Sequence, residues 1–526
     1  MTGVGDGLPL DLLMVAALIG GILLGYPVAF TIAGVATLFA GLGWALGQFD
    51  VALLGALGQR AFGLLTNDVL IAIPLFVFMG VVLEKSRIAE DLMETMGRLF
   101  GPLRGGLGVS VVVVGALLAA STGIVGATVV AMGMIALPTM LRNRYDTPLA
   151  CGIVCTSGTL GQIIPPSTLL IILSDVMSNA YQQAQYEQGK FTIETLSVGQ
   201  MFAAALMPGL MLVGIYIAYL LGRAWLRPAD APAMAAARED RPDLTAVLKA
   251  VVPPVLLIVA VLGSILGGVA TPTEAASVGA VGAVLMAGAR LGGAAGRSSR
   301  LILGGAGALL LLGVAAGAAP VRLQRGDAAT LDWAMGAGYL ALAGVGLAAA
   351  GAALRRLGGA DLLKPALTGT LVITAMIFAT ILTASIFSLV FVGLGGEERI
   401  ESILTAMPGG PTGALLFCMA LIFALGFVLD FVEITVIVLP LIAPLLILMG
   451  HDPIWLSVLI AVNLQTSFLT PPFGFSLFYL RGAAPPSVST GQIYRGVAPF
   501  IVLQLVGIAL IWLWPPVTRW LPGMLY

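Results

Sequence analysis

Two proline pairs, Pro165-Pro166 and Pro471-Pro472, interrupt long apolar segments of this chain. Proline has no backbone N–H and its ring clashes with the preceding helical turn, so neither segment continues as one regular helix. Peptide groups freed in this way are tolerated at membrane depth only where protein buries them or where they line a polar cavity. Secondary transporters build ion and solute sites from such broken helices. The two interruptions therefore predict a transport site within a membrane.

The composition is that of a polytopic membrane protein. Of the 526 residues, 59% are hydrophobic and 10% are charged, whereas soluble domains carry roughly a quarter charged residues. The formal net charge of -1 argues against a nucleic-acid-binding surface. Three cysteines in apolar stretches and a single histidine, His451, provide neither a disulfide framework nor a zinc cluster. We therefore expect an all-α protein in a lipid bilayer, with no cofactor.

About twelve segments approach the roughly 20 apolar residues that a membrane-spanning helix needs. They are residues 9–25, 28–47, 69–83, 149–176, 200–222, 250–268, 274–289, 301–319, 333–354, 366–393, 455–480 and 497–517. Two further apolar runs, residues 105–141 and 413–449, are too short for two crossings and too long for one ordinary helix. We expect each of them to be a re-entrant hairpin that returns to the side it entered from.

The basic residues give the orientation, because Lys and Arg accumulate in cytoplasmic loops. With the amino terminus outside, 19 of the 25 basic residues lie in inside loops. The other six lie outside: Arg60, Lys190, Arg322, Arg325, Arg399 and Arg519. This orientation makes the first hairpin enter from the cytoplasm and the second from the outside, so the two hairpins are inverted relative to each other.

An internal repeat supports the inversion. Three features recur at an offset of 306 residues: Pro138 and Pro444, Asp146 and Asp452, and the two proline pairs. Both aspartates suit helix N-caps, with Pro148 and Pro453 in the first turn behind them. Arg87-Ile88 and Arg399-Ile400 open similar amphipathic stretches on opposite sides of the membrane. Inverted repeats are the architecture of alternating access.

Oxygen-bearing groups gather around the first break. Ser157, Gly158, Thr159 and Gly161 precede it, and the tip of the facing hairpin is Ser121-Thr122-Gly123. Glycines let the backbone come close, while hydroxyls and freed carbonyls are hard oxygen ligands of the kind that hard cations prefer. The set predicts a Na+ site.

The second break carries carboxylates as well. Asn463, Thr466 and Ser467 precede it, and the opposing hairpin tip holds Asp430, Glu433 and Thr435. A charge at mid-bilayer costs roughly 2.5–3.5 kcal/mol on insertion scales and normally faces a partner. No Lys or Arg falls within the predicted spans, so a bound cation is the natural counter-charge for Asp430. The alternative is that Asp430 only caps the second half of its hairpin, with Glu433 three residues later.

An organic acid crossing here would meet no fixed positive side chain. Helix N-termini at the breaks, which carry free N–H groups and a partial positive charge, would bind it instead. The predicted substrate-binding residues are Gln162, Pro165, Pro166, Ser167, Thr168, Thr470, Pro471, Pro472 and Gly474. The competing interpretation, that these groups only satisfy the broken backbone, stays open.

Four segments of the sequence resemble those of a known protein family. The strings STGIVGATVVAMGMIALPTML, SGTLGQIIPPST, NLQTSFLTPPFGFSLF and GGVATPTEAASVGA resemble the large (DctM-like) membrane subunit of tripartite ATP-independent periplasmic (TRAP) transporters. The resemblance covers nearly the whole chain except about residues 296–362, an Ala/Gly-rich insertion that we expect to form two extra helices of unknown role. Longer family members, for dicarboxylate or for mannitol and chloroaromatic substrates, are similar in size.

The resemblance implies an elevator-type Na+ symporter of the bacterial inner membrane for a C4-dicarboxylate or another carboxylate. It implies two partners in trans, a small DctQ-like membrane subunit and a DctP-like periplasmic solute-binding protein. Family sodium sites correspond here to Ser121, Gly123, Ser157, Gly161, Asp430, Asn463 and Ser467. The implied transport domain comprises residues 69–180 and 363–495, with scaffold or arm helices at 1–68, 181–295 and 496–526.

Other functions remain as alternatives. No G-x-x-x-x-G-K-[ST] phosphate loop occurs, so the chain has no ATP-binding signature. Coupling to protons through Asp430 or Glu433 is possible, and so is a Na+- or H+-coupled anion symporter that needs no binding protein. We do not expect an enzyme, because no His, Lys or carboxylate pair across helices offers a nucleophile with its base inside the bilayer.

Overall fold

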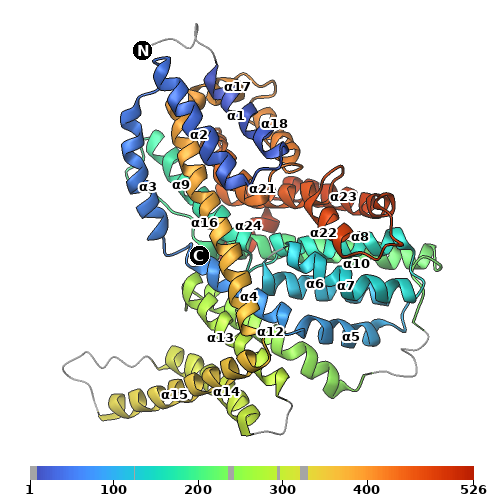
Figure 1. Ribbon diagram of the computed structural model, residues 1–526. Helices are drawn as coiled ribbons and strands as arrows, with labels where there is room; N and C mark the ends of the chain where they lie inside the picture. The colour runs from blue at the N-terminus through green and yellow to red at the C-terminus, as the bar shows by residue number, and fades with distance from the viewer. Residues whose placement is uncertain (1–8, 124, 235–241, 293–296, 320–329) are drawn as a thin grey trace.

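The computed structural model describes residues 9–123, 125–234, 242–292, 297–319 and 330–526, and within these ranges the chain forms helices and no strand. Ten of the described helices are long and apolar enough to cross a membrane. Eight of the twelve predicted spans correspond to such helices, two (149–176 and 455–480) are interrupted, and two (9–25 and 69–83) contain the shorter helices Leu10–Leu23 and Ala72–Lys85. The predicted all-α polytopic fold is confirmed (Figure 1).

The helices follow one another in chain order. The first third contains α1 (Leu10–Leu23), α2 (Val28–Ala45), a 3₁₀ turn (Val51–Ala56), α3 (Leu57–Leu65), α4 (Ala72–Lys85), α5 (Ile88–Phe100), α6 (Gly106–Thr122), α7 (Val125–Arg142), α8 (Thr147–Thr159) and α9 (Thr168–Glu187). The middle contains α10 (Val198–Leu226), α12 (Leu244–Leu266), α13 (Pro272–Leu291), α14 (Arg297–Ala318), α15 (Thr330–Gly359) and α16 (Leu363–Gly393). The last third contains α17 (Gly396–Thr405), α18 (Gly410–Leu425), α19 (Phe431–Glu433), a π-helical turn (Ile434–Val438), α20 (Leu439–Leu448), α21 (Pro453–Leu469), α22 (Phe475–Ala483), α23 (Thr490–Leu513) and α24 (Pro516–Leu525).

Two hairpins pack on two broken helices. In the first repeat, α6 and α7 form the hairpin and both contact α8, the first half of the broken helix. In the second repeat, α18 contacts both α20 and α21. The second half of each broken helix packs on the other repeat. Helix α9 of the first repeat contacts α20 of the second, and α22 of the second contacts α7 and α8 of the first. The two repeats are therefore interlocked into one body.

The predicted N-caps are present in both repeats. Asp146 accepts a hydrogen bond from Leu149 N at 3.1 Å and begins α8, and Asp452 accepts from Trp455 N at 2.7 Å and begins α21. Side chains that satisfy the free N–H groups of a first turn fix where a helix starts. The repeat also extends further than the offset of 306 residues indicates.

Equivalent capping boxes open the helices that follow the two broken helices. Ser197 with Gln200 begins α10, and Ser489 with Gln492 begins α23. Each helix then contains one internal proline, Pro208 or Pro499. Helix α22 is much shorter than α9, and the connection that follows it is shorter as well, so the spacing changes and a fixed offset misses the match.

Helix α23 lies unusually close to α8. A Cβ added at Gly496 would overlap the carbonyl oxygen of Pro148, and one added at Gly152 would overlap the carbonyl oxygen of Gly496. Small residues allow membrane helices to approach in this way. α23 also contacts α21, so this C-terminal helix packs against both broken helices.

Each amphipathic helix that precedes a hairpin is tied to a neighbouring helix by an ion pair. Arg290 of α13 binds Asp91 of α5, and Arg399 of α17 binds Asp11 of α1. Arg87 stands directly before α5, but Arg399 lies inside α17 and does not open it, which corrects that part of the prediction. Two acidic residues in the first turn of α17, Glu397 and Glu398, and the preceding Gly395, at φ +83°, place the helix start three residues earlier.

We expect these two ion pairs to differ in strength. The Asp11 side chain is 1% exposed, whereas Asp91 is 51% exposed. Removing one partner of a buried pair leaves an uncompensated charge and costs roughly 3 kcal/mol or more, while exposed pairs contribute at most about 1 kcal/mol. Arg399→Met should therefore lower the unfolding temperature in detergent far more than Asp91→Asn, and equal shifts would contradict the assignment.

The insertion contains α14 and α15, which project from the rest of the protein in Figure 1. They pack on α13 through a cluster that includes Val284, Ile302 and Ala349. Arg356 donates to the carbonyl of Gly288 and to Ser299 Oγ, each at 2.9 Å. The inserted helices are therefore attached to α13 and lie away from the breaks. Residues 296 and 320–329 of the predicted insertion fall outside the described ranges.

Candidate functional site

The first broken helix opens between α8 and α9. A 3₁₀ turn, Leu160–Gln162, ends the first half, and the buried Pro165-Pro166 bond is cis. Ser167 Oγ donates to the carbonyl of Gln162 at 2.8 Å and accepts from Leu170 N at 3.5 Å. Ser167 therefore satisfies one freed carbonyl and caps α9.

The second broken helix opens between α21 and α22, and its Pro471-Pro472 bond is also cis. Gly474 has φ +43°, and a Cβ there would lie 3.0 Å from the carbonyl oxygens of both Phe468 and Thr470, so only glycine fits. Ser476 Oγ donates to Phe468 O at 2.8 Å, and Tyr494 donates to Pro472 O at 2.6 Å.

Sequence reasoning missed Ser476 and Tyr494. Gln162 and Phe468 are equivalent at the offset of 306 residues, and in each repeat a serine hydroxyl of the second half satisfies this carbonyl. The serines themselves sit at different positions, Ser167 and Ser476, so aligning the two breaks does not identify the second one.

The two broken helices meet at equivalent residues. Gln465 Nε2 donates to Thr159 Oγ1 at 3.3 Å, and these residues are 306 positions apart. Contact between equivalent positions is expected where a pseudo-twofold axis passes between two repeats. Both side chains are fully buried. The structure therefore brings the two interrupted segments together.

The first hairpin packs closely against the first break because glycines lie at the points of contact. Gly158 packs directly against Val129, and a Cβ at Gly161 would lie 3.5 Å from Ala119. At the hairpin tip, Gly123 has φ +60°, and a Cβ there would lie 3.2 Å from Thr168 N. The side chains of Ser121 and Thr122 lie outside the described part of the structure.

The second hairpin closes on the second break in a similar way. Asn463 Nδ2 donates to the carbonyl of Met419 at 2.8 Å. Gly426, where α18 ends, packs directly on Ser467, and the rings of Phe431 and Phe468 lie 6.3 Å apart. Four of the predicted ligands therefore lie against the hairpin of their own repeat: Gly158, Gly161, Asn463 and Ser467.

The hydroxyl groups are oriented in a way that suits a cation. Six of them donate to a backbone carbonyl three or four residues earlier, at 2.6–2.9 Å: Ser157, Thr159, Thr435, Thr466, Ser467 and Thr470. A hydroxyl has one hydrogen and two lone pairs. Because the hydrogen is already used, the remaining lone pairs are available as acceptors.

Several buried polar atoms near the breaks have no hydrogen-bond partner among the residues that the structure describes. They are Thr156 Oγ1, both amide atoms of Gln162, Thr168 Oγ1, Glu433 Oε2 and Gln465 Oε1. Buried polar groups in native proteins are nearly always hydrogen-bonded, so each exception calls for an explanation. Four of these five residues belong to the broken helices or their connection. The orphaned atoms fit a polar ligand that binds at the breaks.

Asp430 is the N-cap of α19, and its Oδ1 accepts from Phe431 N at 2.7 Å. This bond agrees with the alternative interpretation that Asp430 caps the second half of its hairpin. A complete capping box like those at the starts of α10, α13 and α23 is not found at α19, because the Asp430 side chain accepts from Phe431 N and not from the third residue of the helix. No ion pair to Asp430 or Glu433 is found among the described residues.

The two breaks differ in exposure. Residues 161–170 are all buried, whereas Pro472 is exposed and 59% of Phe473 is exposed. The described part of the chain therefore covers the second break less completely than the first.

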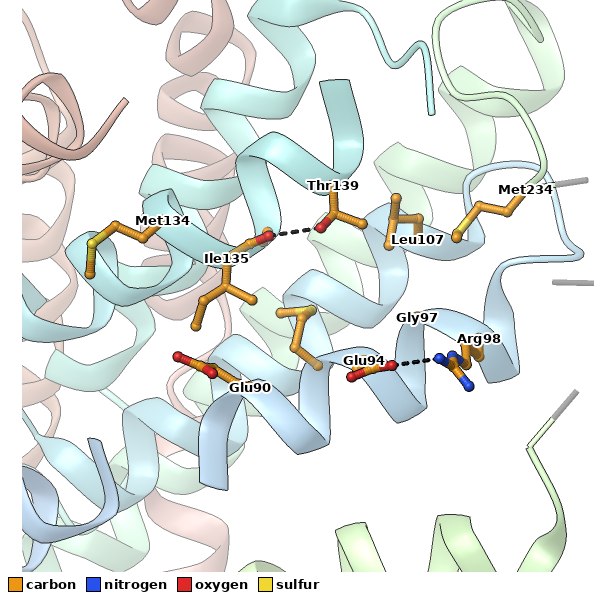
Figure 2. Close-up of a pocket in the computed structure, with 11 residues that line it drawn as sticks. Glu90, Glu94, Gly97, Arg98, Leu107, Met134, Ile135, Thr139 and Met234 are labelled. Carbon is orange, nitrogen blue, oxygen red and sulfur yellow. Dashed lines mark hydrogen bonds and ion pairs between the residues drawn. The ribbon is translucent and has the colours of Figure 1, made fainter. Parts of the chain in front are cut away.

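A separate hollow of about 470 Å³ lies between α5, α7 and Met234 (Figure 2). Met134 and Ile135 of α7 face α5, where Glu94 and Arg98 form an ion pair of 2.6 Å. No residue of either break lines this hollow. Within the described ranges, no group of three or more His, Cys, Asp or Glu residues converges to bind a metal ion.

Comparison with known proteins identifies relatives over the whole chain. The family model described as "Tripartite ATP-independent periplasmic transporter, DctM component" matches residues 15–517. The C4-dicarboxylate TRAP transporter large permease protein DctM of Vibrio cholerae is 27% identical, over 98% of this chain and 97% of that protein. The ectoine TRAP transporter large permease protein TeaC of Halomonas elongata is 24% identical, over 98% and 99%.

Two further similarities bear on assembly and fold. The isethionate TRAP transporter permease protein DctMQ of Oleidesulfovibrio alaskensis is 25% identical over 92% of this chain, which corresponds to 63% of that longer protein. The crystal structure of the Alcanivorax borkumensis YdaH transporter has a TM-score of 0.51 at 13% identity, and the match covers 98% of each chain. The latter similarity concerns the fold alone.

Proposed function

The chain belongs to the DctM family of tripartite ATP-independent periplasmic transporters, and we propose that it carries an organic acid across the bacterial inner membrane by Na+-coupled symport. Its relatives are transporter permeases and not enzymes. The observation that carries the proposal is the contact between the two inverted broken helices, with orphaned polar atoms around it.

Sodium as the coupling ion is supported by the chemistry of the donors. The hydroxyls of Ser157, Thr159, Thr466 and Ser467 present lone pairs next to a glycine-lined backbone. Na+ is a hard cation that prefers such oxygens. Asp430 adds one negative charge without a positive side chain to neutralise it.

A carboxylate substrate is supported by neutral donors at the first break. The amide of Gln162 and the hydroxyl of Thr168 are buried and have no partner in the described part of the chain, and Thr168 lies in the first turn of α9. Free N–H groups and the helix dipole favour an anion there. The solutes named for relatives differ, being C4-dicarboxylate, ectoine and isethionate, so the family alone does not fix the solute.

An elevator movement is supported by the division of contacts. Helices α6–α9 and α18–α22 surround the breaks, while α2 packs on α16, α16 on α4 and α4 on α13. We therefore place α4 and α16 with the static helices, although the predicted transport domain at 69–180 and 363–495 includes them. Part of the predicted scaffold is placed differently in this proposal. α23 crosses α8 at Gly152 and Gly496 without space for sliding, so we place it with the moving body, together with α10, which packs on α6, α21 and α23. The hollow between α5 and α7 would give the first hairpin room to shift.

Two partners complete the proposed transporter. A small membrane subunit would extend the static helices, and the fused protein named DctMQ is consistent with such an association. A periplasmic solute-binding protein would deliver the substrate to the outer face. Both would act in trans.

The test is reconstitution of this chain in liposomes with the two candidate partners, screening carboxylates with and without Na+. We expect uptake only when the binding protein and Na+ are both present. Uptake without the soluble partner would favour the alternative of an independent anion symporter, and uptake that follows the pH gradient in the absence of Na+ would favour proton coupling.

A further inference from the structure

Asp175 is a half-buried carboxylate on α9 that the proposed ion and solute sites do not use. It lies on the same helix as Thr168 and about two turns further from the first break. It forms no ion pair with another residue of the described ranges. Instead, Asn67 Nδ2 donates to Asp175 Oδ1 at 2.9 Å. A neutral amide thus holds this carboxylate.

The side chain of Asn67 is oriented by the backbone that follows it. Its Oδ1 accepts from Val69 N at 2.9 Å, which is the bond of an Asx turn. A side-chain amide accepts through its oxygen and donates through its nitrogen. Because the oxygen is bound to the backbone, the nitrogen is directed to Asp175 and requires an acceptor there. The two side chains are therefore complementary.

The turn that contains Asn67 is attached to the static helices. Thr273 Oγ1, in the first turn of α13, donates to the carbonyl oxygen of Asp68 at 2.6 Å. Helix α4 begins shortly afterwards, at Ala72, and packs on α13 and α16. Asn67 is therefore fixed relative to the static helices.

Asp175, in contrast, belongs to the moving body. Helix α9 packs on α20, α10 and α21, which all move in the proposed function. The bond between Asn67 and Asp175 therefore joins the moving body to the static helices. Another side-chain bond of α9, from Gln183 Nε2 to Glu397 Oε1 at 3.2 Å, is exposed and reaches α17, which contacts α16 as well as α18 and α20. That bond constrains the movement less directly.

The bond between Asn67 and Asp175 is suited to open and close. A hydrogen bond to a charged group is stronger than one between neutral groups, yet a single bond of this kind is readily broken. Asp175 is already partly exposed, on the half of α9 that leads away from the break. Opening would therefore hydrate the carboxylate and would not leave it buried without a partner, which is the costly outcome.

We propose that Asn67 and Asp175 form a latch that holds the moving body against the static helices in this conformation, and that the elevator movement requires its release. Both are positioning residues, since neither belongs to the predicted ion or solute site. The proposal rests on the proposed elevator movement and adds a contact that sets the balance between its two end states.

The experiment measures the distance between the two bodies in the purified full chain, reconstituted in lipid nanodiscs. Gln59→Cys on α3 and Gln188→Cys at the end of α9 place one spin label on each body, and both positions are exposed. α3 is attached to the static α16, because Arg60 donates to the Ser385 carbonyl at 3.1 Å. The three native cysteines are buried, so the added cysteines are the accessible ones.

Asn67→Ala and Asp175→Ala should each increase the share of a second distance at the expense of the wild-type distance. A hydrogen bond to a charged group changes an equilibrium by roughly tenfold or more, and we expect the ratio of the two distances to change by about this factor. Asn67→Ala also removes the bond to Val69 N, so the double variant completes a double-mutant cycle. Because either single substitution already opens the latch, the double variant should shift the ratio little further.

Asp68→Asn is the matched control, because it neutralises an exposed carboxylate next to the latch and should keep the wild-type distances. If the bond is only structural, the variants will have lower unfolding temperatures and unchanged distances, and that result would overturn the proposal. Fully additive effects of the two substitutions would overturn it as well. Should Asp175→Ala not fold, Asp175→Asn must shift the ratio in the same direction, and an unshifted ratio would count equally against the latch.

Failure of the proposed function has a different signature. In that case the distances still respond to Asn67→Ala and Asp175→Ala, but the reconstituted assembly takes up no solute in response to a Na+ gradient. Unchanged distances in an assembly that does accumulate solute would remove the latch and leave the proposed function in place.

Discussion

Asp430→Asn should abolish Na+-driven uptake while leaving the protein folded. Asn is as good an N-cap as Asp, so the bond to Phe431 N is kept and only the charge is removed. A carboxylate and a cation about 4 Å apart attract by roughly 4 kcal/mol at an effective dielectric constant of 20. Even if desolvation offsets part of this energy, we expect Na+ affinity to fall roughly a hundredfold.

The control for this experiment is Asp430→Ala, which removes both the charge and the cap. It should lose uptake to the same extent and in addition lower the unfolding temperature, since a missing N-cap costs about 1 kcal/mol. Normal uptake by Asp430→Asn together with poor uptake by Asp430→Ala would mean that Asp430 acts as a cap only.

Gly496→Ala should strongly destabilise the protein. A Cβ there would overlap the carbonyl oxygen of Pro148 and lie 3.0 Å from Gly152 N. Both are backbone atoms, so α23 would have to move away from α8. Overpacking typically costs 1–3 kcal/mol and occasionally more, and we expect about 3 kcal/mol at this crossing.

Gly491→Ala is the matched control on the same helix, because nothing lies within 4 Å of its added Cβ. Alanine is favoured over glycine in a helix by up to about 1 kcal/mol. The two substitutions should therefore shift the unfolding temperature in detergent in opposite directions, and a neutral Gly496→Ala would show that α23 does not depend on this close crossing.

Much of the fold is predictable from the sequence because proline and N-cap residues act locally. Pro165-Pro166 and Pro471-Pro472 break their helices wherever these segments lie in the protein, and Asp146 and Asp452 cap the helices that follow them. The span lengths follow from apolar runs in the same way. These features depend on a few adjacent residues.

Features that depend on how separate helices pack are not predictable in this way. The bond between Thr159 and Gln465 requires the relative rotation of two helices, and Ser476 and Tyr494 reach their carbonyls from positions without an equivalent in the first repeat. The ion pair of Arg399 with Asp11 joins residues 388 positions apart. A single sequence contains no local signal for such contacts.

The most direct test of the account is solute accumulation in liposomes that contain the reconstituted assembly and no ATP. The account predicts that an inward Na+ gradient alone drives the solute above its external concentration, and that collapsing the gradient releases it. One positive charge moved per solute is worth about 2.3 kcal/mol per 100 mV, so an inside-negative potential should increase the accumulation. Equilibration without accumulation, or accumulation that is the same with and without the Na+ gradient, would contradict it.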